Sequence, residues 1–260
     1  MKEVTAFDVE QYWNNNPLCS AMIPYEQGTK EFFEFHNQLR RKEEPLEFQQ
    51  KVYEFENWAG KSMLDIGCGI GYVVALYASN GVNVTGIDIA PRSIELTQQR
   101  LNHFNLKANL LVCNAEKLVF EDNNFDLVTS YGVLHHTPNT QSAIDEAYRV
   151  LKPGGKAIMM FYNKNSFAYK ILFPLKRLFQ SNWKNKTSQD QVNAVDGPDN
   201  PLGKVYSQND LKKMFSKFEN MSFYTETTFF DKDYLFPVFI KRFICKNFGW
   251  CLYIKCTKPF

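Results

Sequence analysis

At residues 63–71 the chain reads Met63-Leu64-Asp65-Ile66-Gly67-Cys68-Gly69-Ile70-Gly71, with three glycines at alternate positions after a short apolar run. Asp88 follows about 20 residues later, near the end of a second apolar run. Glycines after a strand let the backbone turn sharply and approach a ligand at the N-terminus of the next helix. A carboxylate at the end of the following strand can accept two hydrogen bonds from ribose hydroxyls. This order of elements predicts a site for an adenosine-containing cofactor.

The spacing of the glycines distinguishes between cofactors. A dinucleotide-binding loop reads G-x-G-x-x-G, with its glycines placed for a pyrophosphate, whereas here Tyr72 follows the third glycine, Gly71. Asp65 precedes the loop, and its carboxylate would repel a pyrophosphate but attract an ammonium or sulfonium group. The residues therefore favour S-adenosylmethionine over NAD, and nothing resembles the lysine of a P-loop.

Strand and helix patterns alternate through residues 59–162. We expect strands at 61–66, 82–89, 108–113, 125–131 and 156–161, with helices at 72–80, 91–104 and 140–151. The helix at 140–151 is expected to end at Pro153-Gly154-Gly155. Such alternation predicts a mostly parallel sheet with right-handed crossovers and helices on both faces. The expected fold class is therefore α/β, with a doubly wound, Rossmann-like sheet.

The other segments predict additions to this core. Residues 1–58 carry aromatic residues at helical spacing and predict an N-terminal helical cap. We expect helices that carry the aromatic residues Tyr12, Trp13, Phe32, Phe33 and Phe35 to fold over the cofactor cleft. Residues 163–206 are expected to form an insertion that serves as a substrate lid, and residues 207–260 a helix and two closing strands of the same sheet.

Local signals refine these additions. Within the insertion, residues 166–179 predict a basic amphipathic helix kinked by Pro174, and residues 187–203 predict a loop. Ser207-x-x-Asp210 resembles a capping box that opens a helix to about Phe218. The closing strands are expected at 221–230 and 248–257.

Composition bounds the class of protein. The chain has 260 residues, of which 44% are hydrophobic and 22% charged, as in globular proteins. No uncharged apolar run approaches the ~18 residues of a membrane span. The first residues lack the apolar segment of a signal peptide, so we expect a cytoplasmic protein. The six cysteines form no C-x-x-C pair, and we expect no metal.

Charge is distributed unevenly. Residues 1–162 carry 14 Lys/Arg and 20 Asp/Glu, whereas residues 163–260 carry 16 and 8. This asymmetry is compatible with an anionic surface facing the last third of the chain, or with a solvated lysine-rich face. The tail LFPVFIKRFICKNFGW, at 235–250, could likewise meet a lipid surface as a peripheral contact or pack on the sheet. The basic residues form no stripe with interleaved aromatic residues, so we expect no nucleic-acid partner.

Four segments carry a resemblance to a known family: LDIGCGIGY, GIDIAPRSI, NAEKLVFEDNNFDLVTSYGVLHHTPN and RVLKPGGKA. Together they resemble class I, type 11 S-adenosylmethionine-dependent methyltransferases, in the small-molecule branch that includes ubiquinone/menaquinone-type and sterol-type enzymes. The resemblance covers about residues 60–162 in continuous order.

The resemblance implies a role for particular residues. Asp65, Gly67 and Gly69 would meet the methionine end of the cofactor, with Cys68 and Gly71 completing the loop. Asp88 would hold the ribose and Ile89 would pack on the adenine. The adenine pocket and the sulfonium side would be formed by Asn114, Ala115 and Glu116, and by Tyr131 and Gly132, respectively. The family usually has Asp at the position of Asn114, and an amide can still accept a hydrogen bond from the adenine amino group.

His135 and His136 follow the fourth predicted strand, where α/β folds bind ligands. An imidazole there could act as a general base that removes a proton from the acceptor. His136 better matches the single histidine of the family pattern. The alternative is that these residues cap the strand or bond the loop backbone.

The predicted function is methyl transfer from S-adenosylmethionine to oxygen or carbon of a small, apolar or amphipathic acceptor. The reaction is an in-line displacement, and orientation of the reactants alone contributes ~7–11 kcal/mol. The alternatives are a macromolecular acceptor, protein or RNA, and a catalytically inactive cofactor-binding partner subunit. The sequence leaves the oligomeric state open.

Overall fold

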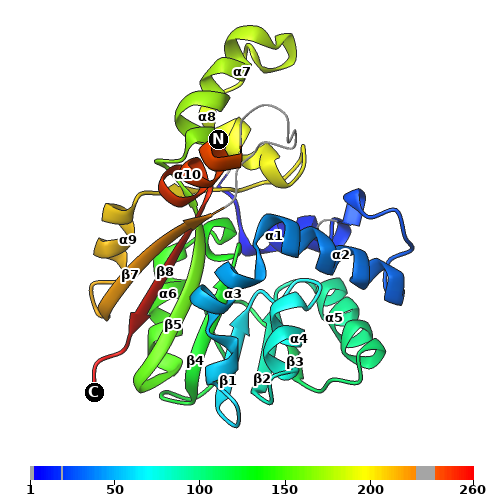
Figure 1. The fold of residues 1–260 in the computed structure, drawn as a ribbon, viewed down its shortest axis with the longest axis vertical. Coiled ribbons are helices and arrows are strands. Elements are labelled where there is room, and N and C mark those ends of the chain that lie inside the picture. Colours follow the sequence, from blue (N-terminus) through cyan, green and yellow to red (C-terminus); the bar gives the residue numbers. More distant parts are fainter. Residues whose placement is uncertain (1–2, 19, 227–237) are drawn as a thin grey trace.

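The computed structural model describes residues 3–18, 20–226 and 238–260. An eight-stranded sheet forms the centre of this part of the chain, in the order β3-β2-β1-β4-β5-β8-β7, with short β6 beside β5 (Figure 1). The strands are β1 (Ser62–Ile66), β2 (Asn83–Asp88), β3 (Asn109–Val112), β4 (Phe125–Tyr131), β5 (Leu151–Asn163), β6 (Val205–Tyr206), β7 (Glu219–Glu226) and β8 (Cys251–Thr257).

The pairing confirms the predicted doubly wound, mostly parallel sheet. β1 pairs in parallel with both β2 and β4, and β3 and β5 extend the sheet in parallel on either side. β8 runs antiparallel to β5 and to β7. The chain leaves β1 toward β3 and then returns to the other side of β1 at β4. This reversal opens a crevice at the carboxyl ends of the strands, where such sheets bind ligands.

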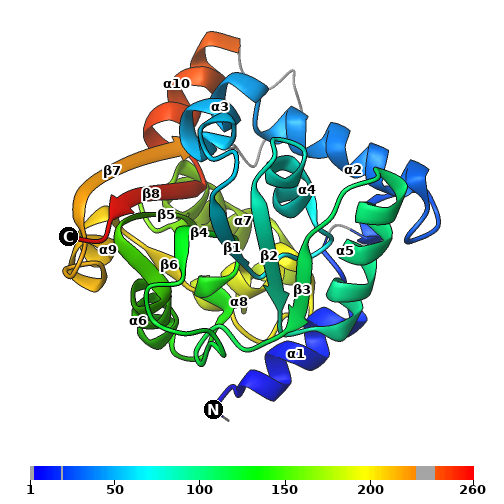
Figure 2. The ribbon, with the colours of Figure 1, turned by 90° about the horizontal axis from the view of Figure 1, so that it is seen from below.

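Helices cover both faces of the sheet (Figure 2). On one face, α6 (Thr140–Val150) and α9 (Gln208–Met214) pack on alternate residues of the strands, among them Leu64, Val128 and Met159. On the other face, α3 (Leu46–Tyr53), α4 (Tyr72–Ala78) and α5 (Pro91–His103) cover Met63, Leu127 and Ile158. The remaining α-helices are α1 (Ala6–Asn15), α2 (Lys30–Glu43), α7 (Phe173–Phe179), α8 (Ser188–Asn193) and α10 (Val238–Phe248).

β5 begins five residues before the predicted 156–161 strand, because the Pro-Gly-Gly turn lies inside it. Gly154 adopts a φ of +75°, and the pairing register with β4 shifts between Phe125 and Leu127. The backbone still bonds the last strand: Gly154 N–H donates to Lys258 O, and Lys258 N–H donates to Gly155 O, both over 2.9 Å. The turn is therefore an irregularity within an extended strand.

The insertion differs from its prediction in two places. A π-helical turn at Ala168–Leu172 leads directly into α7, so Pro174 lies in the first turn of a new helix. The predicted loop at 187–203 contains α8, which begins at a capping box formed by Thr187 and Asp190. The polar composition of this segment predicted a loop, because the short helix has no apolar stripe. Its cap and its buried residues Gln191 and Val192 stabilise it instead.

The C-terminal segment combines confirmed and wrong predictions. The capping box of Ser207 and Asp210 is confirmed at the start of α9. Residues 227–230 of the predicted strand at 221–230 lie outside the described residues. The strand expected to begin at 248 begins at Cys251, since α10 occupies the chain up to Phe248. Each helix among the described residues is too short or too polar to cross a membrane.

Candidate functional site

A pocket lies in the crevice at the carboxyl ends of β1, β2, β3 and β4. Each strand end contributes to its wall, as the doubly wound topology requires. The core residues that line it are Ile66, Gly67, Gly69, Asp88, Ile89, Ser93, Cys113, Asn114, Ala115, Tyr131, Gly132, Val133, His136, Thr137 and Pro138.

The glycine loop is tied to β2 and open toward the pocket. The N–H groups of Gly67 and Cys68 both donate to Ile87 O, over 2.7 and 2.8 Å. Gly67 has a φ of +75°, and a Cβ there would meet Val133 at 2.2 Å. Gly69 has a φ of +54°, and a Cβ there would meet no atom within 4 Å. Gly67 therefore serves packing, whereas the space above Gly69 is available to a ligand.

Asp88 is held by the backbone around it. Its Oδ1 accepts from Ala90 N–H and its Oδ2 from Gly69 N–H, each over 2.9 Å. Burial raises the pKa of this carboxyl, and the hydrogen bonds of Ala90 and Gly69 lower it. Each carboxylate oxygen has two acceptor positions, so the oriented group can still accept from ribose hydroxyls.

Asp65, Cys68 and Gly71 lie behind the pocket wall. The carboxyl of Asp65 is 1% exposed, and its Oδ1 accepts from Thr129 Oγ1 over 2.7 Å. Burial raises the pKa of Asp65 to about 7, which the hydrogen bond of Thr129 partly opposes and the charge of Asp88 reinforces. Cys68 Sγ and the α-carbon of Gly71 both face Thr97 of α5. These residues act on the pocket through charge and packing.

The loop after β3 carries Asn114, Ala115 and Glu116. Asn114 Oδ1 accepts from Glu116 N–H over 2.9 Å and keeps a second acceptor position, so both the oxygen and the nitrogen of the amide can meet a ligand. Ala115 is buried in the pocket wall, and the Glu116 carboxylate accepts from Asn139 N–H over 2.6 Å.

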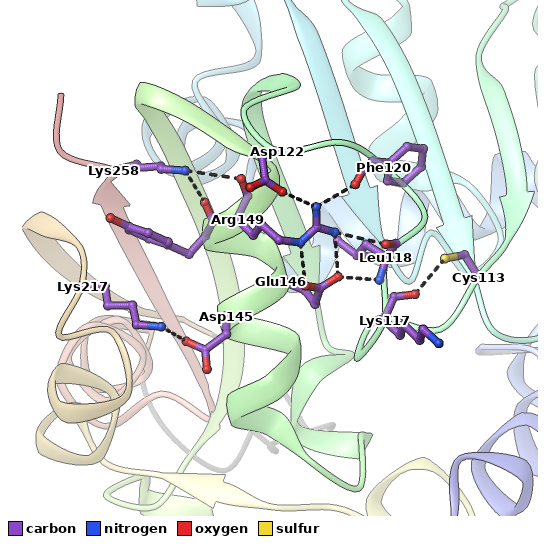
Figure 3. Close-up of polar contacts among 11 residues, drawn as sticks. Cys113, Lys117, Leu118, Phe120, Asp122, Asp145, Glu146, Arg149, Lys217 and Lys258 are labelled. Atoms are coloured by element: carbon purple, nitrogen blue, oxygen red, sulfur yellow. Dashed lines mark hydrogen bonds and ion pairs between the residues drawn. The ribbon is translucent and has the colours of Figure 1, made fainter.

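Arg149 of α6 fixes the rest of this loop (Figure 3). Its guanidinium donates to Leu118 O over 3.1 Å and to Phe120 O over 2.8 Å. It also forms charge-assisted bonds with Glu146, whose Oε2 accepts from Leu118 N–H over 2.7 Å. Hydrogen bonds to charged groups are stronger than neutral ones, so the loop that lines the pocket is pre-organised by the helix behind it.

Tyr131 and Gly132 end β4 in the wall of the pocket. The guanidinium of Arg40 lies 3.8 Å from the ring centroid of Tyr131, and it also bonds Glu44 over 2.8 Å. Glu44 accepts from the phenols of Tyr53 and Tyr253. Burial raises the pKa of Tyr131 well above its usual value, although Arg40 opposes this, so Tyr131 presents a neutral phenol.

The two histidines occupy different places. His136 lines the pocket, whereas His135 is fully buried beside Tyr162, with 3.9 Å between ring centroids, and is no part of the described pocket wall. Burial and the neighbouring His136 hold the pKa of His135 well below its usual value. His136 directs Nδ1 to Leu202 O at 2.5 Å and Nε2 toward Asp196 Oδ2 at 3.3 Å. Nδ1 is therefore occupied by the carbonyl of Leu202, whereas Nε2 has no hydrogen-bond partner among the described residues. A base role for His136 stays a prediction.

Comparison with known proteins bears on this geometry. Residues 64–159, which contain every strand end of the pocket, match a family described as "Methyltransferase domain". This segment, 96 of the 260 residues, is similar to a methyltransferase domain. The match confirms the resemblance read from the four sequence motifs.

Relatives of the methyltransferase domain act on different atoms. A ubiquinone biosynthesis O-methyltransferase of Pseudomonas putida (strain GB-1) is 36% identical over 121 residues, which are 46% of this chain and 52% of that protein. The sterol 4-C-methyltransferase strm-1 of Caenorhabditis elegans is 37% identical over 98 residues, which are 37% of this chain and 29% of that protein. The chain thus matches about half the length of the first relative and less of the second.

The crystal structure of the YcgJ protein from Bacillus subtilis shares the fold. It aligns with a TM-score of 0.57 at 17% identity and covers 81% of this chain and 97% of that one. A sequence identity of 17% shows only that the two proteins share a fold. The aligned part of this chain is longer than residues 64–159.

Residues outside the methyltransferase domain complete the pocket. Ala6, Val9 and Trp13 line it from α1, together with Leu18. The spacing of the first three places them on one face of a helix, a signal that could have found them from sequence. Phe32 and Phe33, expected over the cleft, instead pack with α5 in a separate apolar cluster.

Proposed function

We propose that this chain is an S-adenosylmethionine-dependent methyltransferase that methylates oxygen or carbon of a small, apolar or amphipathic acceptor. The observation that carries the proposal is the open space above Gly69, which faces the anchored carboxylate of Asp88 inside a methyltransferase domain. Intact Asp65 and Asp88 favour an active enzyme over an inactive partner subunit.

The residues present fit the cofactor. Asp88 would accept from the ribose hydroxyls, Ile89 and Ala115 offer apolar surface to the adenine, and Asn114 offers an amide nitrogen to it. Asp65 supplies negative charge behind the loop at the methionine end. When bound, the cofactor supplies an activated methyl group with a neutral thioether as leaving group.

The protein then contributes alignment and exclusion of water. Tyr131 and Gly132, which line the pocket at the end of β4, border the place where the methyl group would pass to the acceptor. Holding nucleophile and methyl group in line removes an entropic barrier worth ~7–11 kcal/mol. A base is required only for an acceptor that keeps its proton near neutral pH, so no catalytic triad is needed.

The acceptor side of the pocket is apolar. Val9, Trp13 and Leu18 form it with Val133. Since the relatives carry quinone and sterol names, a lipophilic acceptor is the class that both the wall and the similarity support. This chemistry favours a small acceptor over a protein or RNA.

A lipophilic acceptor suggests contact with a membrane surface, and two helices support it. α7 exposes Leu175, Leu178 and Phe179, the last at 80%, and α10 exposes Phe239 and Phe243. Residues 166–186 contain four Lys and one Arg and no acidic residue, and residues 238–248 likewise contain basic but no acidic residues. Figure 1 shows both helices at the end of the molecule to which the parallel strands point.

We infer that this basic, apolar surface docks on the headgroups of an anionic bilayer, from the cytoplasmic side. Flotation with vesicles of phosphatidylglycerol and phosphatidylcholine tests it. Binding is expected to weaken with salt and with Leu178→Ser/Phe179→Ser, but not with Val119→Ser, which removes an equally exposed apolar side chain elsewhere. Equal binding to pure phosphatidylcholine would contradict the electrostatic part of the inference.

Calorimetry and turnover test the enzyme itself. We expect the purified chain to bind S-adenosylmethionine and to form S-adenosylhomocysteine with members of a panel of phenolic quinone precursors and sterols. Absence of binding at millimolar cofactor would refute the function. Binding without turnover on any lipophilic compound would remove the proposed acceptor class.

A further inference from the structure

Arg100, on α5, buries its guanidinium between two parts of the fold, with 1% of the residue exposed. Its Nε donates to the main-chain oxygen of Ile70, in the glycine loop, over 2.6 Å. The two terminal nitrogens reach α2, where Nη1 donates to Asn37 Oδ1 over 2.6 Å and Nη2 lies 3.0 Å from Nδ1 of His36. One guanidinium therefore joins the glycine loop to a helix of the N-terminal cap.

Neutral groups stabilise the charge of Arg100. No carboxylate of the described residues forms an ion pair with it, and its hydrogen bonds end on a carbonyl, an amide and an imidazole. Burial lowers the pKa of Arg100 to about 9 and the nearby Tyr72 opposes this shift, so the guanidinium is cationic at neutral pH. The ring centroid of Phe33 lies 4.7 Å from the guanidinium carbon and adds a cation–π contact. Since a buried charge is costly unless it is bonded, and charged donors bond strongly, these three hydrogen bonds are strong contacts.

His36 acts as an acceptor for this guanidinium. Arginine can only donate, so the contact requires a lone pair on Nδ1 and places the ring proton on Nε2. Burial, and then the charges of Arg100 and Arg40, hold the pKa of His36 well below its usual value. The ring is therefore neutral, as the contact requires, and α2 offers two acceptors to one buried cation.

The glycine loop is held by α5 at two successive carbonyl groups. Thr97 Oγ1 donates to Gly69 O over 2.8 Å, and Arg100, three residues further along α5, donates to Ile70 O. The N–H group of Gly69 meanwhile donates to Asp88 Oδ2. The N–H and the C=O of Gly69 are thus both fixed, and Arg100 fixes the next carbonyl. The shape of the loop around its open space depends on these bonds from behind.

The helix α2 lies outside the pocket. None of its residues belongs to the described pocket wall, and it packs against α5 (Figure 2). Two of its contacts reach groups that shape the wall, since Arg40 lies against Tyr131 and Asn37 bonds Arg100. Asn37 makes no described hydrogen bond to the glycine loop, so an effect of Asn37 on the loop passes through Arg100.

We propose that Arg100 is a positioning residue of the cofactor site, which ties α2 to the glycine loop and thereby holds the loop in the form that binds S-adenosylmethionine. The proposal rests on the function proposed above, because it assumes that the cofactor lies above Gly69. Arg100 does not line the described pocket and acts through Ile70. By linkage, a cofactor that prefers the held loop also favours the docked α2.

The first test compares the affinity of full-length variants for S-adenosylhomocysteine, the probe, by calorimetry. Arg100→Met keeps an unbranched apolar chain but removes the three hydrogen bonds. We expect its Kd to rise at least tenfold, since bonds from a charged donor are lost. Arg41→Met removes an exposed guanidinium from α2 and should keep the wild-type Kd. If Arg100 only stabilised the fold, the number of binding sites would fall while the Kd of the folded chains stayed unchanged.

Asn37 provides a second test at a distance from the loop. Asn37→Leu removes the acceptor for Nη1 of Arg100, and we expect Kd to rise about threefold or more. Asn37→Asp keeps an acceptor oxygen and should keep the wild-type affinity, as should Gln38→Leu, which changes an exposed amide at the next position. In the Arg100→Met background, Asn37→Leu should change Kd no further, because the bond that it removes is already absent.

Hydrogen exchange measures the linkage between the cofactor and α2. Saturation of wild type with S-adenosylhomocysteine should slow amide exchange in residues 30–43, although none of them lines the described pocket. Saturation of Arg100→Met should slow it less, because α2 has lost its bond to the loop.

The outcomes separate this proposal from the function on which it rests. If wild type fails to bind the probe at millimolar concentration, the proposed function itself fails. If wild type binds it and Arg100→Met has the same Kd, or if Asn37→Leu weakens binding further in the Arg100→Met background, the positioning role of Arg100 is overturned. If Arg100→Met does not fold, the two variants at position 37 decide, and equal Kd values in Asn37→Leu and Asn37→Asp overturn the proposal.

Discussion

The N–H group of Gly69 donates a 2.9 Å hydrogen bond to Oδ2 of Asp88. This bond joins the glycine loop after β1 to the carboxylate that ends β2. It holds the carboxylate beside the open side of the loop, where the proposed cofactor would meet both groups. The two halves of the sequence motif are therefore one structural unit, and its parts can be tested separately.

The glycines of the loop differ in what a side chain would meet. Gly69→Ala places a methyl group in open space, at a backbone cost of about 1–2 kcal/mol for a positive φ. Gly67→Ala drives a methyl group into Val133 and adds overpacking, for about 2–5 kcal/mol together. We expect Gly69→Ala to lose at least tenfold in S-adenosylmethionine affinity while remaining folded, and Gly67→Ala to unfold much more easily. Denaturant unfolding measures the stability of both variants, and calorimetry measures their affinity for the cofactor. Wild-type affinity in Gly69→Ala would contradict the proposal that the cofactor lies above Gly69.

Asp88→Ala removes the proposed ribose acceptor and the partner of Gly69 N–H. We expect the affinity for S-adenosylmethionine to fall at least tenfold, about 1.4 kcal/mol or more. Asp122→Ala removes a carboxylate from the exposed side of the Arg149 network and is the control. Calorimetry with both variants checks the prediction, which fails if Asp88→Ala binds the cofactor as wild type does.

Asp65 makes cofactor affinity depend on pH. The pKa of Asp65, about 7, lies above its value in the unfolded chain, so the folded protein favours the neutral acid. The stability that this preference contributes is present at low pH and is lost as pH rises from about 4 through 7. The ionised form attracts the cationic cofactor. Affinity for S-adenosylmethionine should therefore increase between pH 6 and 8, and Asp65→Asn should abolish the increase.

S-adenosylhomocysteine provides the comparison for Asp65, because it lacks the sulfonium charge and carries no net charge. Its affinity should change less over the same pH range in wild type. A pH profile of S-adenosylmethionine binding that is identical in wild type and Asp65→Asn would show that another group titrates.

Arg40 and Glu44 form a buried ion pair beneath Tyr131. Arg40→Met leaves Glu44 without its cation, and loss of one buried partner costs about 3–5 kcal/mol. The double variant Arg40→Met/Glu44→Met should lose less free energy of unfolding than Arg40→Met alone. Urea unfolding measures both, and Lys217→Met, which breaks an exposed pair with Asp145, should leave the midpoint almost unchanged. Additive losses in the double variant would contradict this account.

Much of the core followed from local sequence. The strand 125–131 was predicted at its observed limits, and the capping box at Ser207 marked the start of α9. Asp65, Gly69 and Asp88 could be placed at or just after the ends of β1 and β2 from sequence. The signals that place them, which are the hydrophobic period, turn residues and caps, act over only a few residues. Those signals are contained in the sequence itself.

Only the tertiary structure placed Asp196 beside His136 and Trp13 against the same imidazole ring. It also placed Arg40 against Tyr131, 91 positions away in the chain, and turned the Pro-Gly-Gly segment into part of β5. No local pattern encodes such contacts, because they depend on which helix face meets which strand end after the chain has packed. The sequence determined the glycine loop and the alternation of strands and helices, and long-range packing decided what encloses them.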